Sequence, residues 1–252
     1  MNLIEILSWL RDVAPEDTAI SGDPVGLLVH SADRDITHAA VCLDATSAIV
    51  KRASCEGVQL VVCHHPLIYR PLSTIRYADP IGQAITTLVT EGIALYAMHT
   101  NWDLAHGGVN DTLAGVLGLG DVRPLKEVGD ARLARIGEIS AQPLNQFAAT
   151  VNCVLDTTGE SALRYSKRFC DRIVRTIAVC GGAGAFLLPE ALASGADALL
   201  TSDVRHHEFV DADGRNAILI DAGHGATERP GMAHLARLTA DRFPGLRVTF
   251  LA

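Results

Sequence analysis

The sequence lacks the features that mark membrane and secreted proteins. No apolar run approaches the roughly 18 to 20 residues that a membrane-spanning helix needs. At the N-terminus, Glu5, Arg11 and Asp12 interrupt the apolar residues, so there is no basic segment followed by a clean apolar stretch, as a secretory signal would have. We therefore expect a soluble, cytoplasmic protein that does not associate with membranes.

Clusters of basic residues and closely paired cysteines are also missing. The formal net charge is -8, and Lys and Arg do not form the clusters that neutralise nucleic-acid phosphates. This argues against nucleic acid as a partner and favours a small-molecule substrate. The six cysteines include no C-x-x-C pair and mostly lie in apolar stretches. That pattern favours reduced, buried thiols in a cytoplasm over a disulfide framework.

Common catalytic motifs are absent as well. The chain contains no G-x-S-x-G nucleophile elbow, and no cysteine has a catalytic setting. Residues 181–184, Gly-Gly-Ala-Gly, stand between a predicted strand and a predicted helix, where backbone N–H groups could hold an anion. They lack the full dinucleotide or P-loop pattern, so tight packing of the turn is the better interpretation.

The sequence does contain a regular alternation of apolar strands and helices. Of its 252 residues, 48% are hydrophobic and 20% are charged, which suits a globular protein with a sizeable core. Residues 39–43, 47–56 and 58–63 predict a strand, a helix and a strand, and hence a parallel βαβ unit. Further strands are expected at residues 25–29, 93–98, 176–180, 198–201, 217–221 and 247–251, and further helices near the N-terminus and at residues 79–91, 110–117, 185–194 and 232–242.

An internal repeat indicates that the fold is duplicated. Residues 40–63 comprise a strand, a helix, a glycine and a strand, and residues 178–201 repeat this order with the same spacing from the valine to the glycine. We therefore expect an α/β fold of two linked lobes of similar topology. Their strand ends would face one cleft, because open α/β sheets bind ligands at the carboxyl ends of their strands.

The boundaries of the two lobes follow from a change in composition. Residues 121–158 are less hydrophobic and are expected to form strands with polar connections, which lead into the second lobe. We expect the first lobe to comprise residues 1–122 and 222–252 and to carry most of the candidate ligands discussed next. The second lobe would comprise residues 123–221.

Histidines and carboxylates gather at predicted strand ends and in one stretch flanked by glycines. They are His64 and His65, His99 and Asp103, and His224 and Glu228. Each pair has a structural alternative. Adjacent side chains on a strand point to opposite faces, so His64 and His65 share a site only if the chain leaves extended geometry, which Pro66 favours, or if they bind different ions. Otherwise one is buried and hydrogen-bonded and the other is solvated.

The alternatives for the other residues are similar. His99 could be a ligand, a proton shuttle or a core residue bonded to a backbone carbonyl. His224 and Glu228 stand one helical turn apart and could reach one ion, or form a hydrogen-bonded pair at the surface. Four polar residues nearby could orient the ligands or could simply form a polar loop. These four are Asp203, His206, His207 and Glu208.

Taken together, the donors predict a dinuclear metal centre, because nothing else in the sequence explains their concentration. The expected ligands are His64, His65, Asp103, His224 and Glu228. These donors are too many for a single catalytic ion with open positions. They suit two divalent ions roughly 3.5 to 4 Å apart with a bridging carboxylate and water. Zinc, iron(II), manganese and cobalt all accept such mixed nitrogen and oxygen ligands.

Five segments resemble one known family, the dinuclear metal centre proteins also called GTP cyclohydrolase I type 2 homologues or the NGG-interacting-factor-three-like (YbgI-like) family. The segments are Val25-Gly26-Leu27-Leu28, Val62-Cys63-His64-His65-Pro66-Leu67, His99-Thr100-Asn101-Trp102-Asp103, Thr201-Ser202-Asp203 and the stretch from Asp221 to Glu228. The resemblance implies two α/β lobes with a two-metal cleft between them, the same five ligands, and a ring-shaped homohexamer. Cys63 and Ala226 depart from the usual residues, Ser or Thr and a larger residue, which could alter substrate preference.

The expected function is that of a metal-dependent hydrolase in which a dinuclear centre activates a bridging water. Glu228 is expected to bridge the ions and His99 to move a proton. The resemblance implies attack at the purine C8 of GTP followed by ring opening, and phosphoester or amide hydrolysis stays open. A different class of function is a metal-binding hexameric scaffold or regulator without turnover.

Overall fold

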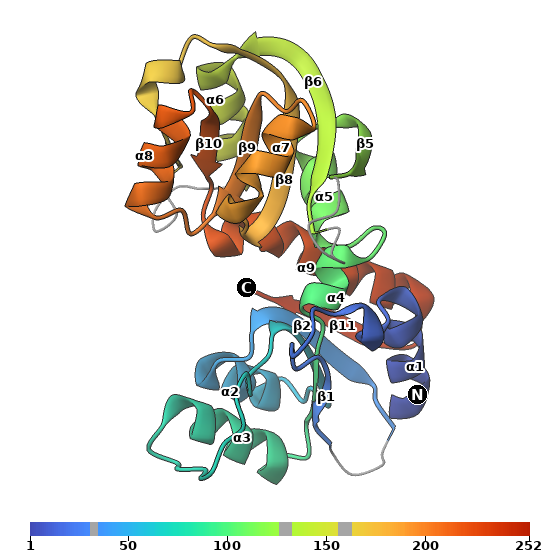
Figure 1. Cartoon of the computed structure of the whole chain (residues 1–252). Coiled ribbons are helices and arrows are strands. Elements are labelled where there is room, and N and C mark those ends of the chain that lie inside the picture. The colour runs from blue at the N-terminus through green and yellow to red at the C-terminus, as the bar shows by residue number, and fades with distance from the viewer. Residues whose placement is uncertain (31–34, 126–132, 156–162) are drawn as a thin grey trace. The chain divides into compact units, whose positions relative to one another are not determined.

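The protein is described from a computed structural model that covers residues 1–30, 35–125, 133–155 and 163–252. Its internal contacts divide the chain into two compact units. Unit 1 comprises Met1–Ala105 and Met232–Ala252, and unit 2 comprises His106–Gly231. Each unit contains one β-sheet covered by helices, so the predicted α/β fold of two lobes is confirmed (Figure 1).

Unit 1 contains a five-stranded sheet in the order β1-β4-β3-β2-β11. Its strands are β1 (Gly26–Val29), β2 (His38–Asp44), β3 (Leu60–His65), β4 (Ala94–Ala97) and β11 (Arg247–Leu251). Strand β1 is antiparallel to β4 at one edge, and the other neighbours pair in parallel. The predicted parallel unit of two strands and a helix is confirmed for β2 and β3. The carboxyl ends of β2, β3 and β4 therefore lie along one edge of the sheet.

Helices α2 (Ser47–Cys55) and α3 (Pro80–Thr90) cover one face of this sheet, and α1 (Leu3–Val13) lies on the other (Figure 1). The sheet can be covered on both faces because successive strand residues point in opposite directions. Alternate residues of the strands therefore pack against α2 and α3 in one core, which includes Val61 and Leu95. On α1, the buried residues recur at helical spacing, as the sequence predicts.

Unit 2 contains a six-stranded sheet in the order β5-β6-β8-β9-β10-β7. Its strands are β5 (Gly120–Pro124), β6 (Arg135–Pro143), β7 (Arg164–Tyr165), β8 (Ile173–Ala183), β9 (Ala198–Ser202) and β10 (Ile218–Asp221). Strands β8, β9 and β10 are parallel, whereas β6 and β7 pair antiparallel with β8 and β10. The parallel pair β8 and β9, with the helix between them, matches β2 and β3 of unit 1, as the internal repeat predicts.

Helices cover both faces of the unit 2 sheet (Figure 1). On one side, α5 (Val109–Val116) and α6 (Leu144–Leu155) pack against a core that includes Ile177 and Val179. On the other side, α7 (Leu188–Ala193) and α8 (His206–Gly214) pack against a core that includes Ala178 and Cys180. The remaining helices are α4 (Thr100–Leu104), α9 (His224–Arg242) and the short 3-10 turns η1 (Glu16–Thr18), η2 (Lys167–Phe169) and η3 (Ala185–Leu187).

The contacts divide the chain at different positions from those expected. Residues 106–122 and 222–231, which the sequence suggested for the first lobe, belong to unit 2. The reason is packing, because α5 contacts β8 and Ala226 of α9 is part of a unit 2 core. His224 and Glu228 are therefore residues of unit 2.

Two stretches differ from the predicted secondary structure. Residues 144–155 form helix α6 rather than strands, because their buried residues recur at helical spacing. Strands β5 and β6 agree with the prediction for residues 121–158, of which 126–132 and 156–158 lie outside the described residues. Helix α9 begins at His224 instead of residue 232 and includes Pro230, a residue that usually marks a helix start or a kink.

All six cysteines lie within the described residues, and none of them forms a disulfide. Cys42, Cys63 and Cys180 are buried as expected, but Cys55 and Cys153 are exposed. Burial raises the pKa of Cys63 to about 12, so this thiol stays protonated at neutral pH and is a poor nucleophile.

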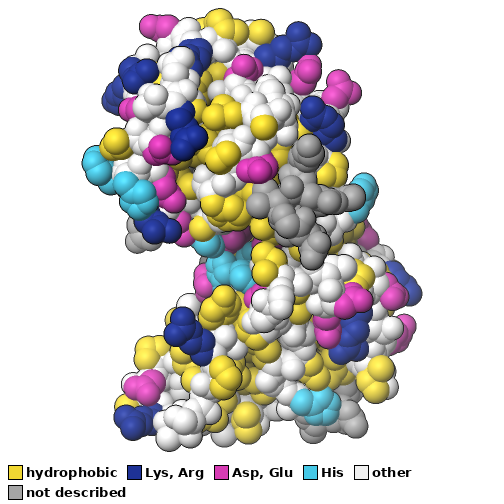
Figure 2. Space-filling view, in the orientation of Figure 1, with side chains coloured by type: hydrophobic (Ala, Val, Ile, Leu, Met, Phe, Trp, Pro, Cys, Tyr) yellow, Lys and Arg dark blue, Asp and Glu magenta, His cyan; other side chains and the backbone are white. Residues whose placement is uncertain are grey.

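The surface carries charges of both signs. On the face seen in Figure 2, Lys and Arg are scattered among Asp and Glu over both units and do not gather into one basic patch. No helix in the described part of the chain has both the length and the apolar character needed to cross a bilayer.

Candidate metal centre

Three histidines of unit 1 lie together where β3 and β4 end, because His64 and His65 are the last two residues of β3 and His99 follows β4. The ring centroids of His64 and His65 are 5.0 Å apart, and those of His99 lie 5.2 and 5.7 Å from them. One nitrogen from each ring lies within 4.8 Å of the other two. The pairing of β3 with β4 ends at Cys63 and Ala97. Although adjacent in sequence, His64 and His65 therefore approach one point where the strand ends.

The tautomer of His64 is determined by the backbone. His64 is fully buried, and its Nδ1 donates to the Met98 carbonyl oxygen at 2.7 Å. Because a carbonyl only accepts, the proton is on Nδ1 and the lone pair is on Nε2. That Nε2 lies 3.5 Å from Oδ1 of Asp103, which is carried by α4. Two electron-pair donors facing each other in a buried position fit a cation that both can bind.

Carboxylates hold the other two rings in the same way. Nδ1 of His65 lies 2.9 Å from Oδ1 of Asp44. Nδ1 of His99 lies 2.8 and 2.9 Å from the two oxygens of Asp23. Each ring therefore keeps the Nε2 lone pair for a ligand. Such carboxylate–histidine pairs orient metal-binding imidazoles and increase their basicity.

Asp23 accepts hydrogen bonds from two neighbouring residues. Besides His99, it accepts a hydrogen bond from the backbone N–H of Thr100 at 3.1 Å and from the hydroxyl of the same residue. Burial alone would raise the pKa of Asp23, but the hydrogen bonds from His99 and Thr100 outweigh it and leave the pKa below its ordinary value. Asp23 is therefore ionised at neutral pH and holds the His99 ring in place.

In unit 2, His224 and Glu228 lie on the first turns of α9. Nε2 of His224 is 3.0 Å from Oε1 of Glu228, and its Nδ1 is 2.7 Å from Oδ2 of Asp203. The hydrogen bond to Glu228 raises the pKa of His224 to about 9, with partial burial opposing it and Asp203 adding to it. Like the three rings of unit 1, this imidazole has its Nδ1 bound by an acceptor and its Nε2 directed at a possible ion position.

Asp221 fixes the two loops that bring these residues together. Its carboxylate accepts the backbone N–H groups of Val204 and Gly223, both at 3.0 Å, and pairs with Arg164. Gly223 has a positive φ of 82°, a conformation that glycine adopts without strain. The turn between β10 and α9 therefore places His224 at the start of the helix.

Residues 181–183, expected to form a turn, continue strand β8, and Gly181 and Gly182 pack closely against the start of α9. A Cβ atom on Gly182 would lie 2.5 Å from Oε1 of Glu228 and 3.4 Å from Nε2 of His224. The Gly182 N–H donates to Oγ1 of Thr227 at 3.0 Å. A Cβ on Gly184 would lie 2.6 Å from Sγ of Cys180. The backbone of Gly182 therefore forms a wall of the site in unit 2.

We expect Gly182→Ala to displace Glu228 and to weaken metal binding by at least about tenfold, a loss in the range seen when the supports of ligands are changed. Gly195→Ala is the matched control, because Gly195 also has a positive φ, of 86°, but a Cβ there meets nothing within 4 Å. Both variants should lose about 1 kcal/mol of unfolding free energy from backbone strain. Equal metal affinities of the two variants would contradict this role for Gly182.

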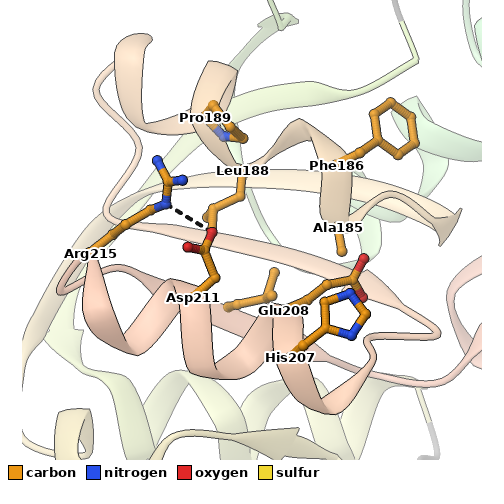
Figure 3. Close-up of a pocket in the computed structure, with 9 residues that line it drawn as sticks. Ala185, Phe186, Leu188, Pro189, His207, Glu208, Asp211 and Arg215 are labelled. Carbon is orange, nitrogen blue, oxygen red and sulfur yellow. Dashed lines mark hydrogen bonds and ion pairs between the residues drawn. The ribbon is translucent and has the colours of Figure 1, made fainter.

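The four polar residues considered as supports of the ligands separate in the structure. Asp203 bonds to His224, as described. His207 and Glu208 instead line a pocket of about 410 Å³ between the η3–α7 segment and α8, together with the ion pair of Asp211 and Arg215 (Figure 3). Glu208 accepts the N–H of Arg205 at 2.7 Å and so caps the helix that begins at His206.

The described structure thus contains two sets of donors. Unit 1 brings together His64, His65, His99 and Asp103, and unit 2 brings together His224 and Glu228. Either set offers imidazole nitrogen and carboxylate oxygen, the donors that zinc, iron, manganese and cobalt accept. That the two sets meet in one cleft and share two ions stays a prediction. Sequence reasoning missed Asp23 and Asp44, because no local spacing relates them to the histidines that they hold.

Comparison with known proteins identifies the family. The pattern of the family Duf34/NIF3 (NGG1p interacting factor 3) matches residues 1–252. A Streptomyces coelicolor protein named GTP cyclohydrolase 1 type 2 homolog is 36% identical over 236 residues, which is 90% of this chain and 82% of that protein. A Clostridium perfringens protein of the same name is 30% identical over 247 residues, with 96% and 92% of the two chains covered.

Solved structures show the same similarity. A Staphylococcus aureus hypothetical protein has a TM-score of 0.92 and 25% identity, and the match covers 100% of this chain and 96% of that one. A Thermus thermophilus protein has a TM-score of 0.84 and 29% identity, with 100% and 98% covered. The resemblance predicted from five sequence segments is confirmed over the full length, and the chain belongs to the Duf34/NIF3 family.

Proposed function

We propose that the protein is a metal-dependent hydrolase with a dinuclear centre held by His64, His65, Asp103, His224 and Glu228. One observation supports this most strongly. Four imidazoles each have Nδ1 bound by a carboxylate or a carbonyl, and two of them direct Nε2 at a carboxylate oxygen 3.5 or 3.0 Å away. Histidines that serve only in packing have no need of this repeated arrangement, whereas metal ligands do.

Two bound divalent ions would supply Lewis acids that lower the pKa of a water molecule towards neutrality. The residues of the chain then have distinct tasks. His64 is held rigidly by Met98, so its Nε2 position is defined before an ion binds. Glu228 is buried at 2% exposure and would supply an anionic oxygen ligand. Its Oε1 lies 3.0 Å from Nε2 of His224 and directly against the backbone of Gly182, so little space is left for another position.

His99 is proposed to carry a proton during the reaction. Its Nδ1 is bonded to both oxygens of Asp23, which fixes the orientation of the ring and leaves Nε2 as the atom that exchanges the proton. A base paired in this way can take a proton from water on Nε2 and return it to a leaving group. The His99 ring lies beside those of His64 and His65, so this base would stand close to the residues that would hold the ions.

The proposed substrate class is taken from the relatives. Curated relatives carry the name GTP cyclohydrolase 1 type 2 homolog, so opening of the purine ring of GTP after attack at C8 is the first reaction to test. Phosphoester hydrolysis and amide hydrolysis are the next reactions to test, because the same metal-activated water would perform them. We further propose a cytoplasmic, ring-shaped homohexamer as the working assembly, on the strength of the family resemblance, and light scattering of the purified protein tests its size.

The direct test is a hydrolase screen on protein loaded separately with zinc, manganese and iron, with GTP among the substrates. We expect hydrolysis in at least one metal form, its loss after chelation, and its return when the same metal is added back. Elemental analysis on the same samples should give two divalent ions per chain. A protein that retains fewer than one ion per chain after metal-replete purification, with no change in His65→Ala, would rule out the proposal.

Metal affinity is expected to depend on pH through His224. Without metal, His224 is protonated below its pKa of about 9, and an ion that binds Nε2 must displace that proton. The affinity for Mn²⁺ should therefore rise about tenfold per pH unit from pH 7 and level off above about pH 9. Free Mn²⁺ measured by electron paramagnetic resonance gives the curve. The variant Asp203→Asn lacks a charge that raises the pKa of His224. Its Mn²⁺ affinity should therefore stop rising at a lower pH than that of the parent.

A further inference from the structure

Beside the histidine cluster, unit 1 contains a pocket of about 230 Å³. It lies between the carboxyl ends of β2 and β3 and the starts of α2 and α3. His65 forms part of its lining, and most of the remaining lining is apolar, including Pro66, Leu67, Pro80 and Ile81. Drug-sized ligands occupy pockets of about 300 to 1,000 Å³. This smaller pocket therefore suits one or two rings, bound in direct contact with a proposed metal ligand.

One long loop supplies two sides of the pocket. Residues 66–79 connect β3 to α3 without a helix or strand. Pro66 and Leu67 at the start of this connection line the pocket, as do Pro80 and Ile81 of α3, which directly follow its end. Loops of this length inside a compact domain are uncommon and usually functional. The loop exposes four large apolar side chains, Tyr69 at 60%, Leu72 at 43%, Ile75 at 59% and Tyr77 at 71%. Such a concentration of exposed apolar groups indicates a binding surface.

The same loop carries two arginines, Arg70 and Arg76. Within the described residues, neither side chain has a hydrogen-bond or ion-pair partner, whereas Arg52 of α2 pairs with Glu56. The backbone of Arg76 is held against α3, because a Cβ atom on Gly82 would lie 1.9 Å from its carbonyl oxygen. The backbone of Arg76 is thereby fixed next to Gly82, the residue that follows the pocket-lining Ile81. Guanidinium groups bind phosphate oxygens through paired N–H donors, and two of them balance the nearly double charge of a phosphate monoester.

We propose that this pocket and loop form the substrate-recognition site. The pocket binds a planar apolar ring against Pro66, Leu67 and Ile81, and Arg70 and Arg76 bind a phosphate group on the same molecule. The description of this molecule as a substrate rests on the proposed hydrolase function, since the ring would contact His65. The binding of the molecule itself requires only unit 1.

The test compares phenyl phosphate with inorganic phosphate, by calorimetric titration into the zinc-loaded full-length protein. We expect phenyl phosphate to bind at least about tenfold more tightly, because its ring leaves water for an apolar pocket. Ile81→Trp, which fills the pocket, should reduce this advantage to less than about twofold. Val89→Trp is the matched control, since Val89 is exposed on the same helix and does not line the pocket. It should keep the full advantage.

The arginines are tested with the double variant Arg70→Gln and Arg76→Gln. Both phosphate probes should bind at least about tenfold more weakly to this variant, and the remaining affinity should depend less on salt. Lys51→Gln, at an exposed position on α2 outside the pocket lining, should bind both probes as the parent does.

Three results would overturn the proposal. The first is a parent protein that binds phenyl phosphate no better than phosphate. The second is an unchanged ring advantage in Ile81→Trp, with circular dichroism confirming that the variant is folded. The third concerns the double variant Tyr69→Ser and Tyr77→Ser. If its assembly size changes while its affinity for phenyl phosphate stays the same, the loop is an interface between copies. Zinc content is measured in parallel. If the parent protein binds no zinc but still binds phenyl phosphate more tightly than inorganic phosphate, the hydrolase proposal fails and the pocket proposal is supported.

Discussion

His64→Ala is expected to lower the affinity for Zn²⁺ by more than about 100-fold, because changes to groups that merely support ligands already cost 10- to 100-fold. The effect should be large because His64 is fully buried and its Nε2 is directed at Asp103 by the bond from Nδ1 to Met98. Zinc bound per chain, measured by elemental analysis after dialysis against a weak chelator, gives the result.

His38→Ala is the matched control for this experiment. His38 is also a buried histidine of unit 1, but both of its ring nitrogens are bonded to protein groups. Nδ1 contacts the Glu56 carbonyl oxygen at 3.2 Å, and Nε2 contacts Oγ1 of Thr249 at 2.8 Å. This variant should lose about 1 to 3 kcal/mol of unfolding free energy, because it leaves buried partners unsatisfied. It should retain its zinc. Loss of zinc in both variants would show that folding, not ligation, is responsible.

Glu228→Gln is expected to reduce turnover by about 10³-fold while the assembly remains intact. Removal of a positioned group that acts in the reaction typically costs between 10² and 10⁴ in rate. Glutamine has the size of glutamate, so the close contacts of Glu228 with Gly182 and His224 can be kept, but a neutral amide cannot serve as an anionic ligand. The measurement is kcat for the best substrate of the screen, together with light scattering.

A suitable control is Glu138→Gln, because the side chain of Glu138 is partly exposed and pairs with Arg175 in unit 2, away from the residues proposed as ligands. Its turnover should match that of the parent. The experiment also separates the two classes of function. If the metal-loaded parent hydrolyses nothing and Glu228→Gln breaks the assembly, the ions serve a scaffold and the hydrolase proposal fails.

The two units show why part of the fold could be predicted from the sequence. The order of β2, α2 and β3 follows from short apolar strands and a helix with turn residues between them, all of which are local signals. The repeat of this order around β8, α7 and β9 predicted the second unit. The prediction was wrong for residues 144–155, which were expected to form strands but form helix α6. The predicted start of the last helix was also wrong. The helix was expected from residue 232, whereas α9 begins at His224 and includes Pro230.

The sequence by itself determined which residues offer the right chemistry, because His64, His65, Asp103, His224 and Glu228 stand where strands end and helices begin. Tertiary structure alone decided how those residues are held. Asp23 reaches His99 across 76 positions, Asp44 reaches His65 across 21, and Asp203 reaches His224 across 21. The physical reason is that periodicity and turn signals act over a few residues. Which carboxylate meets which imidazole depends on the packing of whole strands, which no local pattern records.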